Sequence, residues 1–518
     1  MVRPTFMGME TMKSAIFANQ KSLDIVGNNI SNLDTTGYTR QRVDRTSVSQ
    51  SYLSTRVASN RVGLAGQGVD VLGVSQVRDA FLDKRFREEY SKASYHSQAS
   101  GILNDIQSAL GDGYDITDES GLTGAFQQIY ESINDYSQDS TMDAQANLVM
   151  AAFKNMAQVL QQLDSKLDQV AEQQIYDTQI DVDRVNDILE EIAHLNKTIS
   201  QDATVLSDPD NEYFRPNELL DQRNLLLDEL AGYGDISVTE LPDGTVNVEM
   251  GGMAAVTGLT HNSLSLTVNN DQTIALSWVS NGEKTQFSEG SLLASQHFIN
   301  GRGSNVQSGN EEPYQGILYY RDRLDTLANA IADVANHSIP VVDSSTGKPQ
   351  KDANGNTVYK TLIAAKMSNG KTNAKVSVAA ANISISDEWT QGGPGYFIYD
   401  KNQDVPNYAQ KLSGALTGES YTFVSYGESF SGSFEEYVHD YLSKLGTDIS
   451  YQEGRNEAVA KVADDFLDRR DEISGVSKDE ETVDMLKYQS SFEAAARVMT
   501  TLDELLDVVI NRMGRVGL

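Results

Sequence analysis

Residues that could do chemistry are few and scattered in this 518-residue sequence. None of the six His lies three or four residues from another, as a helical zinc site requires: His96, His194, His261, His297, His337 and His439. No G-x-S-x-G nucleophile elbow, P-loop or G-x-G-x-x-G dinucleotide-binding pattern occurs. The absence of cysteine excludes disulfides, thiolate metal ligands and a Cys nucleophile. The sequence therefore predicts that this is not an enzyme and has no catalytic, cofactor-binding or metal-binding residues.

One acidic segment, Asp352 to Asn356, has part of the pattern of a calcium-binding loop. In such a loop the glycine is the sixth residue and a bidentate Glu is the twelfth. Here Gly355 is the fourth residue, and Ile363 stands at the twelfth position. We therefore expect a surface turn at this segment.

The composition allows a sizeable core and excludes several classes of partner. Hydrophobic residues make up 39% of the chain, and the length allows about three domains. The formal net charge of −33 repels nucleic-acid phosphates and anionic membranes, and no stretch approaches the ~20 apolar residues of a membrane span. We therefore expect no nucleic-acid partner and no membrane insertion. The N-terminus also lacks the apolar region of a cleaved secretion signal, so we expect none.

The first element that could position other residues is a helix near the N-terminus. Its apolar residues follow two seven-residue tracks that alternate three and four apart, which is typical of a coiled-coil seam with one polar position. After this helix, Gly37 offers a turn at which φ > 0 costs little. The tracks are Met9, Ile16, Leu23 and Ile30, and Met12, Asn19, Val26 and Leu33.

The C-terminus carries a matching helix pattern, with no Gly or Pro between Val476 and Met513. Ser477 is predicted to cap this helix, with Glu480 completing a capping box. Two such helices paired only with each other should be marginally stable, so we expect them to need surface from other subunits; the alternative is that they pack on the chain's own core. The tracks are Met485, Phe492, Met499, Leu506 and Met513, and Tyr488, Ala495, Leu502 and Val509.

The middle of the chain reads mainly as helix. Residues 125–208 contain no Gly or Pro, which predicts a helix of about 50–60 residues with a slip in its apolar phase around Gln174 to Asp183. Asn217 is predicted to cap a helix that ends near Gly232. Further helices are predicted at 78–110, 313–337 and 434–473.

Strands are predicted between these helices. Val69, Val71 and Val74 alternate in a strand-like stretch at 46–78. A hairpin is predicted from the alternation at 236–238 and 246–250 around Pro242-Asp243-Gly244, and strand-like runs continue at 264–268 and 274–278. A second β-rich stretch runs from about 339 to 425.

The order helix, β, helix, β, helix predicts a chain that runs out and returns. The predicted fold is mainly α with β insertions: paired N- and C-terminal coiled-coil helices, an elongated helical body, and outer β-rich domains, built from discontinuous segments. The expected divisions are a terminal axial domain at 1–45 and 477–518, a helical body at 46–230, 311–338 and 430–476, and β-rich outer domains at 231–310 and 339–429.

Several short segments carry a resemblance to a known family. Asn28 to Asn32, followed by Thr36 to Arg40, resembles the N-terminal signature of the bacterial flagellar axial proteins, which form the rod, the hook and the hook-associated layers. Lys487 to Gln489 and Glu493 to Met499 are similar to the C-terminal partner of that signature. Asn217 to Arg223, together with the helical middle, resembles the hook-associated members.

The resemblance implies a structural component of the extracellular flagellum, an adaptor at the hook–filament junction that contributes to motility. It implies assembly through the terminal helices after type III export without a cleaved signal. The implied partners are copies of the chain in a ring-like oligomer, the hook protein, the next junction protein toward the filament, and an export chaperone on the C-terminal helix. The alternatives are a hook or distal rod protein of the same family, or a secreted enzyme or adhesin carried in the β insertions.

The apolar tracks of the two terminal helices and the resemblance together predict which residues act in assembly. In the signature, the Asn side chains are expected to satisfy a helix end, Gly37 to turn the chain outward, and Tyr38 to anchor the turn through its ring and hydroxyl. The signature residues are Asn28, Asn29, Asn32, Gly37 and Tyr38. The predicted assembly interface consists of Met9, Met12, Ile16, Leu23, Val26, Ile30, Tyr488, Phe492, Met499, Leu502, Leu506 and Val509.

Overall fold

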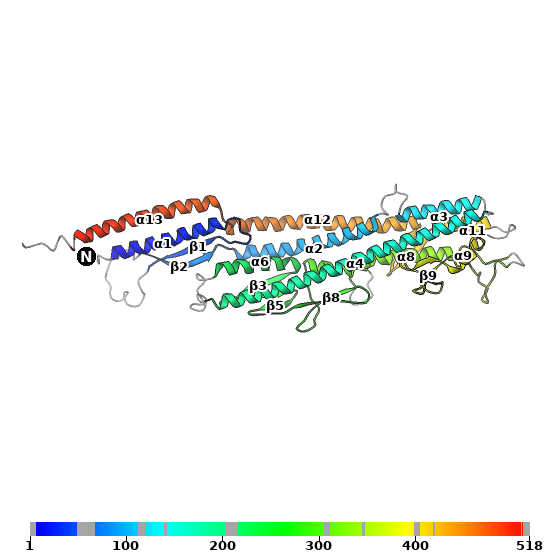
Figure 1. The fold of residues 1–518 in the computed structure, drawn as a ribbon, viewed down its shortest axis with the longest axis horizontal. Coiled ribbons are helices and arrows are strands. Elements are labelled where there is room, and N and C mark those ends of the chain that lie inside the picture. The colour runs from blue at the N-terminus through cyan, green and yellow to red at the C-terminus, as the bar shows by residue number, and fades with distance from the viewer. Residues whose placement is uncertain are drawn as a thin grey trace, which may run out of the picture.

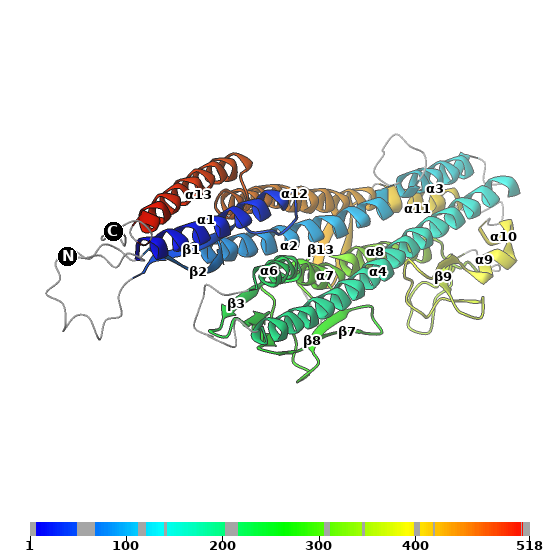
Figure 2. The ribbon, with the colours of Figure 1, turned by 60° about the vertical axis from the view of Figure 1, so that its left-hand side comes forward.

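Long helices that run along one axis give the protein an elongated shape (Figure 1). The two terminal helices, α1 (Met7–Ser31) and α13 (Lys478–Asp507), lie side by side at one end of the molecule (Figures 1 and 2). The predicted return of the chain to its starting point is therefore confirmed. This computed structural model describes residues 7–48, 68–111, 121–138, 142–202, 216–304, 311–343, 348–397, 405–417, 420–508 and 510.

A two-stranded antiparallel hairpin lies against α1. Its strands are β1 (Gln41–Ser47) and β2 (Val69–Gln76), paired from Gln41 opposite Gln76 to Ser47 opposite Val69. The valine alternation had predicted β2. We call α1, β1, β2 and α13 the terminal region.

The rest of the described chain forms a body built on long helices. Two of them, α2 (Ala80–Leu110) and α12 (Phe434–Ser474), pack against each other in opposite directions and continue the line of the terminal region (Figure 1). A third, α4 (Asp143–Ser200), has 58 residues, so the predicted long helix is confirmed. The other body helices are α3 (Gly121–Gln138), α6 (Asn217–Tyr233), α7 (Ser291–Ile299), α8 (Ile317–Asn336) and α11 (Val405–Thr417).

The predicted phase slip in α4 is filled by polar residues whose hydrogen bonds are satisfied. Gln174 and Thr178 are buried between two apolar stripes. The Thr178 hydroxyl donates to the Gln174 carbonyl at 2.7 Å, and Gln174 Nε2 donates to Asp105 on α2 at 2.8 Å. The helix thus changes its buried face without breaking.

Small antiparallel sheets lie mainly along one flank of the body and at its end farthest from the terminal region, and one more lies in the middle of the body between α8 and α12 (Figures 1 and 2). The predicted hairpin is confirmed, and Gly244 in its turn has φ +80°. One sheet joins β3 (Ile236–Glu240), β4 (Val246–Met250), β5 (Met253–Thr257) and β6 (Thr260–His261), and a second joins β7 (Leu264–Val268) and β8 (Ile274–Trp278). The others join β9 (Ile363–Lys366), β10 (Thr372–Asn373) and β11 (Ile383–Ile385), and β12 (Tyr421–Ser425) and β13 (Glu428–Gly432).

Two apolar clusters form the core, and both belong to the body. The larger one lies among α2, α3, α4, α8, α11 and α12, and contains Trp389 against Phe153. The smaller one lies between the second half of α4, α6 and the first two sheets, and contains Trp278. Both Trp side chains are fully buried.

Two of the predictions made from the sequence were wrong. Residues 405–417, within the stretch predicted as β-rich, form α11, because Ala409, Leu412 and Leu416 recur at helical spacing and are buried. The short helices α9 (Asp387–Gly392) and α10 (Pro394–Phe397) lie in the same stretch. Asn217 does not cap α6: it lies inside the first turn, and its side chain donates to the Val74 carbonyl at 3.1 Å.

Candidate assembly site at the joined chain ends

The structure places the predicted interface residues along the paired helices α1 and α13. Val26 and Leu506 are buried. Leu502 packs so closely on Gly8 that a Cβ added there would lie 3.2 Å from its Cδ1 atom. Val509 lies outside the described residues. The remaining members are partly buried: Met9, Met12, Ile16, Leu23, Ile30, Tyr488, Phe492 and Met499.

The most buried face of α1 lies beside the predicted seam and covers the β1–β2 hairpin. Ala18, Ser22, Val26 and Asn29 are all buried on this face. Arg45 of β1 reaches it, donating to the Ala18 carbonyl at 3.0 Å, to Asn19 Oδ1 at 3.1 Å and to the Ser22 hydroxyl. Its guanidinium also lies 4.8 Å from the ring centroid of Tyr488 on α13. Arg45 therefore joins both terminal helices, a role that no local sequence pattern indicated.

Asn29 connects three segments through one buried amide. Its side chain is 1% exposed. Its Nδ2 donates to the Gln41 carbonyl at 2.9 Å and to Glu481 Oε2 at 3.1 Å, while its Oδ1 accepts from the Gln41 N–H at 3.0 Å. The residue thus ties the end of α1 to the start of β1 and to the start of α13, which is a wider role than the predicted helix-end satisfaction.

The other signature residues surround this amide. The Tyr38 hydroxyl donates to Asn29 Oδ1 at 2.9 Å and accepts from Asn28 Nδ2 at 3.2 Å. Burial, and then the charges of Asp221, Glu218 and Glu481, raise the pKa of Tyr38 well above its usual range, so the hydroxyl remains a donor. Asn32 Nδ2 donates to Asn28 Oδ1 at 3.0 Å, and Gly37 turns the chain at φ +79°.

An ion-pair group closes the base of the paired helices α1 and α13, which we call the terminal pair. Arg40 Nε lies 2.7 Å from Glu481 Oε1, and its Nη1 lies 2.9 Å from Glu480 Oε2. Glu481 is 2% exposed and faces Asn29, whereas Glu480 is exposed. Ser477 caps α13 as predicted, accepting from the Glu480 N–H at 3.5 Å. The Glu480 carboxylate, however, binds Arg40 in place of the predicted reciprocal capping bond.

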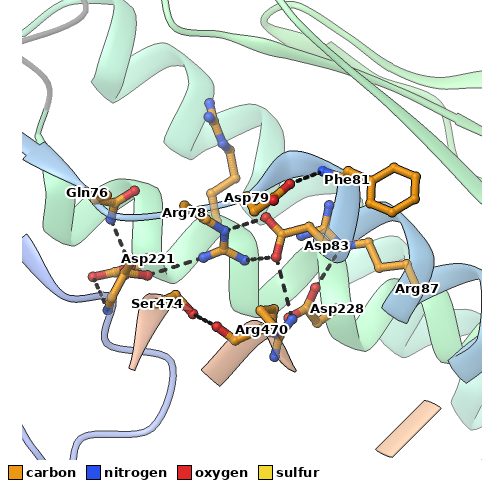
Figure 3. A network of polar contacts seen from close by, with 12 residues as sticks. Gln76, Arg78, Asp79, Phe81, Asp83, Arg87, Asp221, Asp228, Arg470 and Ser474 are labelled. Carbon is orange, nitrogen blue, oxygen red and sulfur yellow. Dashed lines mark hydrogen bonds and ion pairs between the residues drawn. The ribbon is translucent and has the colours of Figure 1, made fainter. Parts of the chain in front are cut away.

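A second polar group lies where the terminal region meets the body (Figure 3). Asp228 of α6 accepts from Arg87 of α2 at 2.7 Å through Oδ1 and from Arg470 of α12 at 2.6 Å through Oδ2. Arg78, just before α2, binds Asp83 at 2.6 and 3.0 Å, and Arg470 lies 3.8 Å from Asp83. We call Arg78, Asp83, Arg87, Asp228 and Arg470 the polar joint.

The Asn217–Arg223 segment connects the same place to the rest of the body. Asp221 accepts from the Thr39 N–H at 3.2 Å and from Gln76 Nε2 at 2.8 Å (Figure 3). Burial raises the pKa of Asp221, against the opposing effect of its hydrogen bonds from Thr39. Arg223 Nη1 donates to Asn196 Oδ1 of α4 at 3.0 Å and to the Gly244 carbonyl at 2.7 Å. This segment therefore holds the terminal region, α4 and the first sheet in register.

The hydrogen bonds and ion pairs described above hold helices in position relative to one another. A cleft of about 740 Å³ opens beside the polar joint, between the loop after α1 and the facing sides of α6 and α12. Within the described ranges, no group of three or more His, Asp or Glu side chains could hold a metal ion. Searched over the same ranges, no helix is long and apolar enough to cross a membrane.

Three family models match the chain, in the order expected from its segments. The model described as flagella basal body rod protein matches residues 9–39. The model described as flagellar hook-associated protein FlgK helical domain matches residues 104–339, and the one described as flagellar basal body rod FlgEFG protein C-terminal matches residues 468–513. The matches at both ends are thus to axial proteins in general, and the match in the middle is to the hook-associated protein.

Full-length relatives carry the same description. The flagellar hook-associated protein 1 of Bacillus subtilis is 28% identical over 98% of this chain and 99% of its own length. That of Salmonella typhimurium is 24% identical over 96% of this chain and 98% of its own length. The solved structure of the flagellar hook junction protein FlgK from Burkholderia pseudomallei is 16% identical, with a TM-score of 0.41, over 55% of this chain and 47% of that chain.

These comparisons decide against the alternative of a hook or distal rod protein. A hook or distal rod protein would share the end matches, but the helical-domain match and the two full-length relatives belong to hook-associated protein 1. The chain belongs to the hook-associated protein 1 family, and it is a structural, non-enzymatic component of the hook–filament junction of the extracellular bacterial flagellum.

Proposed function

We propose that this chain forms a ring-like layer with copies of itself, and that the terminal pair is the assembly surface. The observation that carries this proposal is a second apolar face on α13, turned away from the buried Ala495 and Leu506. Val483 is 64% exposed, Leu486 57% and Leu505 62%. Large apolar side chains gathered on one exposed helix face mark an interaction site. Val498 and Val508 lie on the same broad face and are also exposed.

The interface residues predicted from the sequence and this exposed face have separate roles in the proposal. The predicted residues hold α1 and α13 together within one subunit, and the exposed face of α13 then packs on neighbouring subunits. In the assembled flagellum these neighbours are copies of the chain, the hook protein on one side and the next junction protein on the other.

Before assembly the same face needs protection. We propose that an export chaperone covers the C-terminal helix, and that the chain leaves the cell unfolded by the type III route without a cleaved signal. An exposed apolar face of this size would otherwise promote self-association. The absence of cysteine suits a chain that is exported unfolded.

The proposed domains follow one another along the long axis of the molecule. We propose a terminal axial domain at 1–45 and 477–518, a helical body at 46–230, 311–338 and 430–476, and β-rich outer domains at 231–310 and 339–429. The position of the sheets on the flank and at the end away from the termini supports an outer, solvent-facing place for them (Figure 2).

The test is binding of the purified monomer to isolated flagellar hooks, measured by co-sedimentation, which avoids any effect on export. Leu505→Asp removes one exposed leucine from α13. Burying a leucine contributes about 1.5–3 kcal/mol, so we expect the binding constant to fall by about tenfold or more. Val279→Asp is the matched control, because Val279 is an equally exposed apolar residue of the body, at 63%. Unchanged hook binding by Leu505→Asp, at the affinity of the control, would refute the proposal.

A further inference from the structure

The cleft between the terminal region and the body has an apolar lining that is partly open to solvent. We call this cleft of about 740 Å³ the boundary cleft. Leu225 of α6, Leu467 of α12 and Leu33 in the loop after α1 line it. Leu225 remains 45% exposed and Leu33 38%. Apolar side chains left open in a hollow of this size are typical of a binding site.

Carboxylates surround these leucines. Asp34, Asp471 and Glu472 line the boundary cleft, and their side chains make no hydrogen bond or ion pair with any described residue. The two cationic residues of the lining, Arg78 and Arg470, are already bound to Asp83 and Asp228 of the polar joint. The cleft therefore presents negative charge to an incoming group.

Contacts between the terminal region and the body hold the walls of the cleft in place. Gly37 packs on Leu225, so that an added Cβ would lie 3.6 Å from the Leu225 Cβ atom. Asp221 accepts from the Thr39 N–H at 3.2 Å and from Gln76 Nε2 at 2.8 Å. The boundary cleft is therefore preformed in the single subunit, which lowers the entropic cost of binding a partner.

The first turns of α2 carry a group with the opposite charge. Phe81 is 60% exposed, and the Arg85 guanidinium carbon lies 5.3 Å from its ring centroid. Lys84 is exposed beside them. Glu88 lies 2.9 Å from Arg85 and 3.8 Å from Lys84, so two cations and one anion leave one net positive charge. We call Phe81, Lys84 and Arg85 the α2 knob.

The α2 knob and the boundary cleft lie at the same level on opposite sides of the subunit. Arg78 lines the cleft three residues before Phe81, so the two surfaces lie within about 10 Å of each other along the chain. At about 100° per residue, the knob occupies one face of α2, and the buried Asp83 and Arg87 occupy the other. That buried face is turned toward α6 and α12, whose sides form the cleft (Figure 3).

We propose that the α2 knob of one copy of this chain inserts into the boundary cleft of the next copy. Phe81 enters between the leucines, and Lys84 and Arg85 face the carboxylates. An aromatic side chain in a pocket supplies much of the affinity of an interface, and opposite charges orient the partners. Two different surfaces that fit each other repeat in one direction from copy to copy, and this contact closes into a ring when the rotation allows.

The inference rests on the ring of copies proposed above, and it adds a contact that involves no residue of the exposed α13 face. The absence of cysteine makes this contact testable by disulfide cross-linking. In the double variant Lys84→Cys/Asp34→Cys, one thiol lies in the knob and one at the cleft. The chain is bound to isolated hooks, oxidised and separated on a denaturing gel without reductant. We expect a ladder of disulfide-linked multimers, because every copy carries both sites.

Each single variant should remain monomeric on the same gel. Lys84→Cys alone would form dimers in a symmetric contact between two knobs, and that result would overturn the inference. Chain that sediments with the hooks and gives no multimers would also overturn it, and would leave the proposed assembly function standing. Unmodified chain that does not sediment with hooks contradicts the proposed function itself.

Phe81→Ala in the double-cysteine background measures the contribution of the aromatic ring. We expect the cross-linking yield to fall by about tenfold, because the ring no longer fills the cleft. Tyr451→Ala is the matched control, because Tyr451 is an equally exposed aromatic residue of the body, at 60%. An equal yield in the two alanine variants would contradict the role assigned to Phe81.

Discussion

The amide of Asn29 allows a quantitative prediction about the terminal region. Replacing it with alanine removes the hydrogen-bond partners of both the N–H and the carbonyl of Gln41, which is itself buried. A buried backbone group left without a partner costs about 1–3 kcal/mol, so the two groups give about 2–6 kcal/mol. The Tyr38 hydroxyl and Glu481 each lose one further contact.

Hydrogen exchange of the purified monomer measures this loss where it occurs. Even the lower figure, about 2 kcal/mol, corresponds to a fall of about 30-fold in the protection of amides in α1, β1 and the first turns of α13. Amides in α4 should be unaffected, because the body has its own cores. Asn28→Ala is the matched control: Asn28 is partly exposed, and its side chain bonds only to Tyr38 and Asn32. Equal protection of these amides from exchange in Asn29→Ala and Asn28→Ala would refute the role assigned to the Asn29 side chain.

Two further predictions concern the body. Burial, and then the charge of Asp177, raises the pKa of Asp181 to about 6. Because its pKa in the unfolded chain is about 3.9, ionisation of Asp181 lowers the free energy of unfolding as the pH rises from about 4 to about 6. Asp181→Asn should therefore raise the free energy of unfolding by about 1–2 kcal/mol at pH 8 and by much less at pH 4, and an equal gain at both pH values in urea denaturation would contradict this. Arg223→Ala should lower the free energy of unfolding by about 2–4 kcal/mol, because the Gly244 carbonyl loses its charged donor. The exposed Arg42→Ala should change it by less than about 0.5 kcal/mol, and a similar small effect for Arg223→Ala would exclude a structural role for that arginine.

The spacing of apolar residues predicted most of the helices in this protein, because a helix that buries one face must repeat its apolar residues about every 3.6 residues. The 58-residue α4 was accessible in this way, whereas the cap of α13 by Ser477 followed from the spacing of Ser477 and Glu480. The helix α11 was missed because its surroundings are rich in Gly, Asn and Ser, although Ala409, Leu412 and Leu416 carried the signal.

The polar contacts at the chain ends were much less accessible. Arg78, Asp228 and Arg470 come from three distant parts of the sequence and meet only in the folded chain. No local spacing distinguishes them from the many exposed charges of an acidic protein. Family resemblance singled out Asn29 and the Asn217–Arg223 segment, but the atoms that they contact required coordinates.

The chain passes twice between the terminal region and the body, and this double connection has a mechanical consequence. A pull on the terminal pair enters the body through two covalent strands at once, Val77–Asp79 into α2 and Gly475–Ser477 into α12. These two helices are packed against each other, so tension is shared between them and no single helix must unwind to carry it. The bonds that Asp228 accepts from Arg87 and Arg470 resist sliding of one helix past the other when the two connections carry unequal loads.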